Sequence, residues 1–224
     1  MGVKPEPELR IVERPWRASL AVHPQVVEAC SLASLQIRGP SVKRLGVTSA
    51  IRGEGRSAVA LAMAVVQQRD FANHPLLLEM DFDRPSLSRR LHTEASPGLA
   101  ELIRGDVTIE EAVQPLSEGI AVITAGAANG AAARLVVDVT GSSLLEQLSQ
   151  RFDVVIADLP PLLGCSFGTL AAELFDPVVL VVRAGITPIA QIREATASLS
   201  RPPVVLLNGT QSRLPRWIRS LTHT

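Results

Sequence analysis

The stretch that decides the fold is LGVTSAIRGEGRS, residues 45–57. A short β-branched and apolar run leads into a turn that ends in a cation and a hydroxyl, with Gly53, Gly55, Arg56 and Ser57 as its key residues. Glycines let successive backbone N–H groups converge on phosphate oxygens, a cation contacts the outer phosphates, and a hydroxyl can bind Mg²⁺. The stretch therefore predicts a phosphate-binding loop between a strand and a helix.

The match to the P-loop pattern G-x-x-x-x-G-K-[ST] is incomplete. Ala50 stands at the first glycine, and Arg56 stands where lysine is expected. A tight strand-to-helix turn without a ligand is the alternative interpretation. Residues 58–68 are rich in Ala, Leu, Met and Val and predict a buried helix, whose N-terminus would face the phosphates.

Composition bounds the class of protein. The chain has 224 residues, of which 46% are hydrophobic, so it can bury a full core in one large domain or at most two. The formal net charge is zero, which gives no global attraction to nucleic acid, and we expect no nucleic-acid partner. Aromatic residues make up only 3% and tyrosine is absent, whereas Ala, Val and Leu dominate, as is typical of a parallel sheet under helices.

The sequence also predicts the compartment. Cys30 and Cys165 lie far apart and are interpreted as reduced thiols, because nothing indicates a disulfide framework. Residues 1–17 carry charges throughout and have no apolar segment typical of a signal peptide. No apolar run approaches the roughly 18 residues needed to span a bilayer. We therefore expect a soluble, cytoplasmic protein.

Apolar runs and helical patterns alternate along the chain. Helices are expected at residues 22–38, 58–68, 98–105, 109–113, 142–150 and 188–199, and strands at 45–49, 76–80, 120–124, 152–158, 178–182 and 204–207. Residues 125–133 form a loop of small residues, with a mobile linker as the alternative. The alternation predicts a doubly wound, mostly parallel α/β sheet flanked by helices in three layers. We expect a flexible arm at 1–20, a nucleotide-binding domain at 21–212 and a tail at 213–224.

Carboxylates follow two of the expected strands. The run at 76–80 ends in Asp81 and Asp83, and FDVVIADLPP, residues 152–161, leads into Asp158 and a double proline. Ligands of open α/β sheets bind at the carboxyl ends of the strands. Asp158 is placed as a Walker B carboxylate, which reaches Mg²⁺ through water, although an aspartate that caps the next turn is the common alternative.

The order of the motifs is more specific than any one of them. It is LGVTSAIRGEGRS, LLLEMDFDRPSL, GLAELIRG, FDVVIADLPP, VVLVVRAG and VVLLNG. This order resembles the cytoplasmic domain of the bacterial tyrosine kinases (BY-kinases), P-loop NTPases that control capsule and exopolysaccharide synthesis, over residues 23–209. The order of motifs also resembles that of the septum-site and partition ATPases, but these carry a signature lysine where this chain has Ile51.

The resemblance implies ATP and Mg²⁺ as cofactors and Arg56 and Asp81 as catalytic residues. The nucleotide-binding residues that it implies are Arg52, Gly53, Glu54, Gly55, Arg56, Ser57, Ala58 and Asn208. The implied Mg²⁺ ligands are Ser57, Glu79, Asp81 and Asp158. An amide offers both a donor and an acceptor to the adenine edge, so the role of Asn208 is chemically sensible, with a turn former before Gly209 as the alternative.

Four departures from the family pattern bear on catalysis. Arg56 is a planar fork in place of a compact lysine. Glu79 replaces the first aspartate of the Walker A′ segment, Asp83 stands where an arginine is usual, and Phe167 replaces a third acidic residue. These changes favour retained binding with weakened chemistry.

Two departures bear on assembly. The family's tail carries tyrosines that neighbours phosphorylate, and this chain has none. The first helix of the family carries Glu-x-x-Arg-x-x-Arg for ring assembly, whereas Glu28 is followed here by Ser31 and Ser34. Bidentate arginine pairs cannot form from serine, so this mode of self-association is not expected.

The C-terminal residues form an amphipathic pattern at i, i+3, i+4 and i+7, with Leu214, Trp217, Ile218 and Leu221 as the apolar residues and arginines among them. One interpretation is a terminal helix that covers the protein's own sheet. The other is a short basic helix that weakly contacts anionic lipid or a membrane partner, which would place the protein at the inner face of the cell membrane.

Three functions follow from these features. The first is an ATP-binding, pseudokinase-like regulator of exopolysaccharide or capsule synthesis or export, partnered with a membrane-embedded polysaccharide chain-length or export protein. The second is an active protein-tyrosine kinase or ATPase that phosphorylates a partner. The third is a membrane-surface ATPase of the septum-site or partition type.

Overall fold

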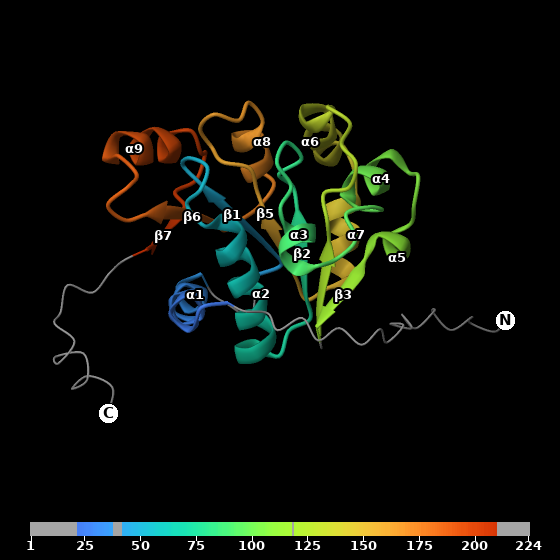
Figure 1. The fold of residues 1–224 in the computed structure, drawn as a ribbon, viewed down its shortest axis with the longest axis horizontal. Helices are drawn as coiled ribbons and strands as arrows, with labels where there is room; N and C mark the ends of the chain where they lie inside the picture. Colours follow the sequence, from blue (N-terminus) through green and yellow to red (C-terminus); the bar gives the residue numbers. More distant parts are fainter. Residues whose placement is uncertain (1–21, 38–41, 118, 210–224) are drawn as a thin grey trace.

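The computed structural model describes residues 22–37, 42–117 and 119–209. The predicted arm at 1–20 and the predicted amphipathic tail at 213–224 lie outside these residues. The described chain forms one seven-stranded sheet in the order β3-β4-β2-β5-β1-β6-β7, with helices on both faces (Figure 1). The strands are β1 (Arg44–Ser49), β2 (Pro75–Glu79), β3 (Gln114–Ser117), β4 (Ile120–Ile123), β5 (Val154–Asp158), β6 (Val178–Arg183) and β7 (Val204–Asn208).

The sheet is parallel except at one edge. The first strand, β1, lies between β5 and β6, both of which it pairs with in parallel register. Only β3, an edge strand, runs antiparallel, beside β4. Parallel neighbours bring their carboxyl ends to the same edge of the sheet, so the segments after β1, β2, β5 and β6 meet there. The predicted doubly wound, mostly parallel fold is confirmed.

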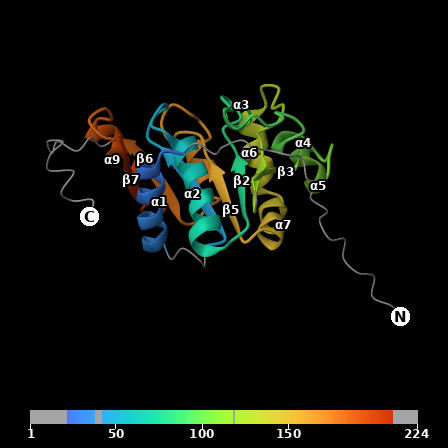
Figure 2. The same ribbon diagram turned by 60° about the horizontal axis from the view of Figure 1, so that its bottom comes forward.

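Helices cover both faces of the sheet. They are α1 (Pro24–Gln36), α2 (Arg56–Phe71), α3 (Leu87–Leu91), α4 (Leu99–Arg104), α5 (Ile109–Ala112), α6 (Ala132–Thr140), α7 (Leu144–Arg151), α8 (Gly168–Ala172) and α9 (Ile189–Ala197). Figure 2 shows α1 and α2 side by side on one face. Residues of α4 to α9 pack in the core on the opposite face. No helix among the described residues combines the length and apolar character that crossing a bilayer requires.

The central strands read as continuous apolar runs because both of their faces are buried. In β2, Leu76 and Leu78 face the core of α4 to α9, whereas Leu77 faces the core of α1 and α2. All three leucines are fully buried. In β5, Val155 and Ile156 divide between the two cores in the same way.

Four elements were not expected from the sequence. The edge strand β3 is four residues long and contains Gln114 and Pro115, so it lacks the apolar run that marks the other strands. Helices α3 and α8 have five residues each, which is too short for a helical period to be visible. Helix α6 begins at Ala132, inside the loop expected at 125–133, and its apolar side is buried through Leu135 and Val139.

Candidate functional site

The loop after β1 has the backbone that its glycines predict. Gly53 and Gly55 have φ of 86° and 97°, in the left-handed region that favours glycine. A side chain at Gly55 would also collide with Asn208, because a Cβ there would lie 2.2 Å from Asn208 Nδ2. Helix α2 begins at Arg56, so Arg56, Ser57 and Ala58 form its first turn. The free N–H groups and positive dipole end of a sixteen-residue helix thus face the carboxyl edge of the sheet.

The side chain of Glu54 holds this loop from behind. It is 1% exposed, and its carboxylate accepts hydrogen bonds from Ile51 N at 2.8 Å, Arg183 N at 3.0 Å and the Thr187 hydroxyl. These donors come from the loop itself, from the last residue of β6 and from the segment that follows it. The carboxylate is therefore a structural brace, a role that sequence reasoning missed.

Asn208, at the end of β7, also holds the loop. Its Nδ2 donates to the Glu54 carbonyl at 2.8 Å, and its Oδ1 accepts from Gly209 N at 2.8 Å. The structure therefore brings this predicted adenine ligand to the phosphate loop, with its amide engaged by protein groups. Its contact with adenine stays a prediction.

Glu79 and Asp158 end two adjacent strands and are paired in the register of β2 and β5. Both are 1% exposed. Glu79 Oε1 accepts from Ser86 N and Leu87 N, and its Oε2 accepts from Ala125 N at 3.1 Å. Burial raises the pKa of Glu79, and these backbone hydrogen bonds oppose the rise. Glu79 thus joins three chain segments, and its metal role stays a prediction.

Asp158 has a different environment. Burial raises the pKa of this carboxyl to about 7, while the Arg56 charge and the nearby Ser57 hydroxyl act to lower it. Its Oδ1 is buried without a hydrogen-bond partner. Such an orphaned oxygen is uncommon in a folded protein and needs an explanation, of which an absent ion or ligand is one.

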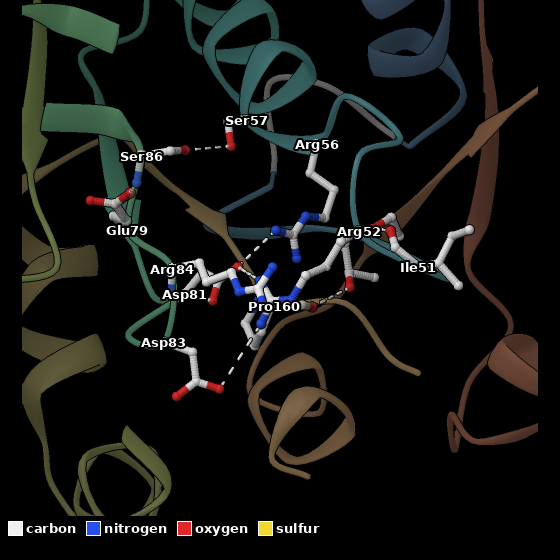
Figure 3. A network of polar contacts seen from close by, with 12 residues as sticks. Ile51, Arg52, Arg56, Ser57, Glu79, Asp81, Asp83, Arg84, Ser86 and Pro160 are labelled. Atoms are coloured by element: carbon white, nitrogen blue, oxygen red, sulfur yellow. Dashed lines mark hydrogen bonds and ion pairs between the residues drawn. The ribbon is translucent and has the colours of Figure 1, made fainter. Parts of the chain in front are cut away.

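The Asp81 carboxylate accepts hydrogen bonds from arginine side chains of the glycine loop and from a backbone N–H group (Figure 3). Its Oδ2 accepts from Arg52 Nη1 at 2.9 Å and from Arg56 Nη2 at 2.8 Å, and its Oδ1 accepts from Arg84 N at 3.2 Å. Arg52 also lies 3.9 Å from Asp83. The second nitrogen of the Arg56 fork, Nη1, is buried without a partner. The predicted site residues Arg52 and Arg56 are therefore in direct contact with the predicted catalytic residue Asp81.

The oxygen donors of the site fit Mg²⁺. Among the residues that the structure describes, no three His, Cys, Asp or Glu side chains form a group that could hold a metal by themselves. Mg²⁺ in phosphate sites keeps several waters and takes few protein ligands, usually one or two carboxylates beside the phosphates. The Ser57 hydroxyl, which influences the Asp158 carboxyl, and the unpartnered Asp158 oxygen match this chemistry.

Two further residues border the site. The Ser86 hydroxyl lies 3.3 Å from that of Ser57, a contact that was not anticipated from the sequence. Phe167, where the family pattern has an acid, is buried as the residue before α8. It offers no oxygen to the site.

A glycine loop at the N-terminus of a long helix, facing carboxylates from neighbouring strand ends, defines the class as a P-loop NTPase fold. No protein-family model matches the chain. The kinase domain of VpsO has the same fold, with a TM-score of 0.76 and 25% identity over 84% of this chain and 95% of that domain. Cobyrinic acid a,c-diamide synthase from Mycobacterium smegmatis, solved with an ATP analogue and magnesium, shares the fold at a TM-score of 0.58 and 19% identity, over 80% of each chain.

Curated relatives narrow the class. The tyrosine-protein kinase YwqD of Bacillus subtilis is 29% identical over 160 residues, which are 71% of this chain and 67% of YwqD. The tyrosine-protein kinase ptk of Acinetobacter johnsonii is 28% identical over 66% of this chain. The succinoglycan biosynthesis transport protein ExoP of Rhizobium meliloti is 24% identical over 70% of it. The chain is a relative of the bacterial tyrosine kinases, and it matches only 20% of the length of ptk and of ExoP.

Proposed function

We propose that the protein binds ATP with Mg²⁺ at the carboxyl end of β1 and regulates exopolysaccharide or capsule synthesis or export, with weak or no kinase activity. One observation carries the nucleotide part. Arg56 Nη1 and Asp158 Oδ1 are a buried donor and a buried acceptor without partners, next to the glycine loop. A phosphate oxygen satisfies the first, and a hydrated cation satisfies the second.

The residues have distinct tasks in this proposal. The backbone of Gly53 to Ala58 and the side chain of Arg56 hold the phosphates, with Arg52 at the loop's rim. Ser57 and Asp158 hold Mg²⁺, which supplies charge neutralisation on the phosphate oxygens when bound. Asp81 and Glu79 remain further proposed ligands, and Asn208 the proposed adenine contact.

Three features favour weak phosphoryl transfer. The Arg56 side chain is 10% exposed and its fork is paired with Asp81, so it lacks the freedom of a lysine to follow a migrating phosphoryl group. Both oxygens of Glu79 already accept backbone hydrogen bonds. Phe167 adds no carboxylate. Loss of one well-placed transition-state contact slows chemistry by about 10²- to 10³-fold.

Calorimetric titration of the full chain with ATP and Mg²⁺ tests the nucleotide part. We expect saturable heat for the natural protein and a loss of its Mg²⁺ dependence in Asp158→Asn. The absence of heat at high protein concentration would remove nucleotide binding from the proposal. Asp138→Asn, a substitution on the exposed side of α6, is the matched control, and we expect it to titrate like the natural protein.

Radiolabelled ATP tests the kinase part, and here an active kinase acting on a partner is the second candidate. Asp81 favours it, because this carboxylate lies at the loop where a base or metal ligand would be needed. The chain has no tyrosine, so phosphotyrosine in the assay can come only from an added substrate. Label transfer to a tyrosine peptide or partner above an Asp158→Asn control would establish the active kinase.

The partner in this proposal is a membrane-embedded polysaccharide chain-length or export protein. The similarity to ExoP, a succinoglycan biosynthesis transport protein, supports this class of partner. A membrane-surface ATPase of the partition type is distinguished by liposome flotation of the full chain against a chain lacking residues 213–224. Equal flotation of both would exclude a lipid-binding role of that tail.

A further inference from the structure

Two guanidinium groups meet on one carboxylate oxygen at the front of the loop. Arg52 Nη1 and Arg56 Nη2 lie 2.9 Å and 2.8 Å from Asp81 Oδ2. Figure 3 shows these side chains from close by. The Asp81 side chain is 3% exposed. Charge-assisted bonds of this length are the geometry with which arginine also binds phosphate oxygens.

The two arginines differ in how they are fixed. Arg56 is the first residue of α2, its side chain is 10% exposed, and its free Nη1 is buried. Arg52 precedes Gly53, its side chain is 28% exposed, and it also lies near the half-exposed Asp83. Arg56 therefore belongs to the inner part of the loop and Arg52 to its outer rim.

Arg52 and Arg56 together form a two-arginine clamp, and Asp81 competes with any other anion for it. Two cations at one point repel each other unless an anion lies between them, and a buried carboxylate next to a polyphosphate would add like-charge repulsion. A phosphate oxygen and the Asp81 oxygen therefore cannot share the position. The backbone contact with Arg84 N involves the other Asp81 oxygen and does not depend on the clamp.

We infer that Asp81 Oδ2 takes the place of an oxygen of the nucleotide's terminal phosphate in the free protein, and that Arg52 is the residue that distinguishes a triphosphate from a diphosphate. This inference rests on the proposed function. A triphosphate reaches the rim and displaces Asp81 from both arginines. A diphosphate is held by the loop backbone and Arg56 and leaves Arg52 paired with Asp81.

Binding of ATP and of ADP to the full chain in EDTA tests this, because chelation removes any metal-ligand role of Asp81. We expect Arg52→Gln to weaken ATP roughly tenfold or more and to change ADP less than about threefold, so that the ATP-to-ADP preference collapses. We expect Asp81→Asn to tighten ATP several-fold. Arg134→Gln and Asp138→Asn, which break an exposed arginine–aspartate pair on α6, are matched controls that leave both affinities unchanged.

The outcomes separate the inference from the proposed function. If the natural protein binds neither nucleotide, with Mg²⁺ or without it, the proposed function fails and the inference falls with it. If both nucleotides bind but Arg52→Gln weakens them equally, or Asp81→Asn weakens ATP, only the inference is overturned. If Asp81→Asn does not fold, the ATP-to-ADP ratio of Arg52→Gln decides alone, because this variant retains the buried Arg56–Asp81 pair.

Discussion

The carboxyl ends of β2 and β5 lie side by side, and each carries a buried carboxyl group. The two groups differ in how fully the protein satisfies their hydrogen-bonding capacity. Glu79 and Asp158 are register partners, and both are buried. Glu79 binds three backbone N–H groups, whereas Asp158 keeps one oxygen without a partner. The difference teaches that acidity at a strand end does not define a ligand site. Of these two carboxylates, only Asp158 keeps hydrogen-bonding capacity that no protein group satisfies.

Among the substitutions that test this comparison, Glu79→Ala is expected to cause the largest loss of stability. It strands buried donors of Ser86, Leu87 and Ala125, so we expect the free energy of unfolding to fall by about 3 kcal/mol or more. Urea denaturation followed by circular dichroism measures the loss. Glu79→Gln retains one acceptor oxygen and should lose roughly half as much. An unchanged denaturation midpoint for the alanine variant would refute the structural role.

Asp158 should reveal itself through pH. The pKa of Asp158 is about 7 in the folded protein, above the roughly 3.9 of an unfolded aspartate. Between roughly pH 3.9 and about pH 7, the folded protein therefore keeps a proton on Asp158 that the unfolded chain has released. Stability then falls as pH rises through this window, by at most about 1.4 kcal/mol per unit, and levels off above the folded pKa. Asp158→Asn should remove this component from unfolding curves at pH 5, 6 and 7. Parallel pH profiles for both proteins would contradict the assignment.

Glu54 extends the comparison to a third buried carboxylate, at the back of the loop. Glu54→Gln keeps the shape but loses an acceptor, so we expect about 1–2 kcal/mol lower stability and weaker ATP binding. Thermal melts with and without nucleotide report both effects. A variant that loses stability but gains or keeps full affinity would show that the brace does not shape the loop.

The smallest expected effect is that of Asp138→Asn, which measures how much stability is lost when an exposed aspartate is removed. Asp138 pairs with Arg134 at the surface of α6, where the two side chains are 38% and 78% exposed. Exposed i,i+4 pairs contribute about 0.3–0.5 kcal/mol, so Asp138→Asn should shift the urea midpoint barely at all. A loss comparable to that of Glu79→Ala would mean that the assay does not report strand-end chemistry.

Much of the architecture could be predicted because a strand buried on both faces must be apolar throughout. Residues 45–49 and 178–182 were expected as strands and fall within β1 and β6. The edge strand β3 escaped prediction, since its pairing with β4 stabilises a polar segment that has no apolar run of its own.

The site was harder to predict for a related reason. The pattern brought Arg56, Ser57, Asp81 and Asp158 together, and the structure places them in one region. It could not reveal the structural role of Glu54, two of whose three donors lie 129 and 133 residues away, or the engagement of the Asn208 amide. A side chain's partners are fixed by the return of distant backbone, which local sequence does not encode.

The contacts of Glu54 with the end of β6 and with Thr187 have a consequence for biosynthesis. On the ribosome, residues 45–57 emerge long before Arg183 and Thr187, and the first strand waits for β5 and β6 to fill the positions on either side of it. Domains fold as units during translation. The full set of Glu54 contacts therefore cannot form before Arg183 and Thr187 have been synthesised, and a nascent chain halted after β5 lacks two of the donors that hold the loop.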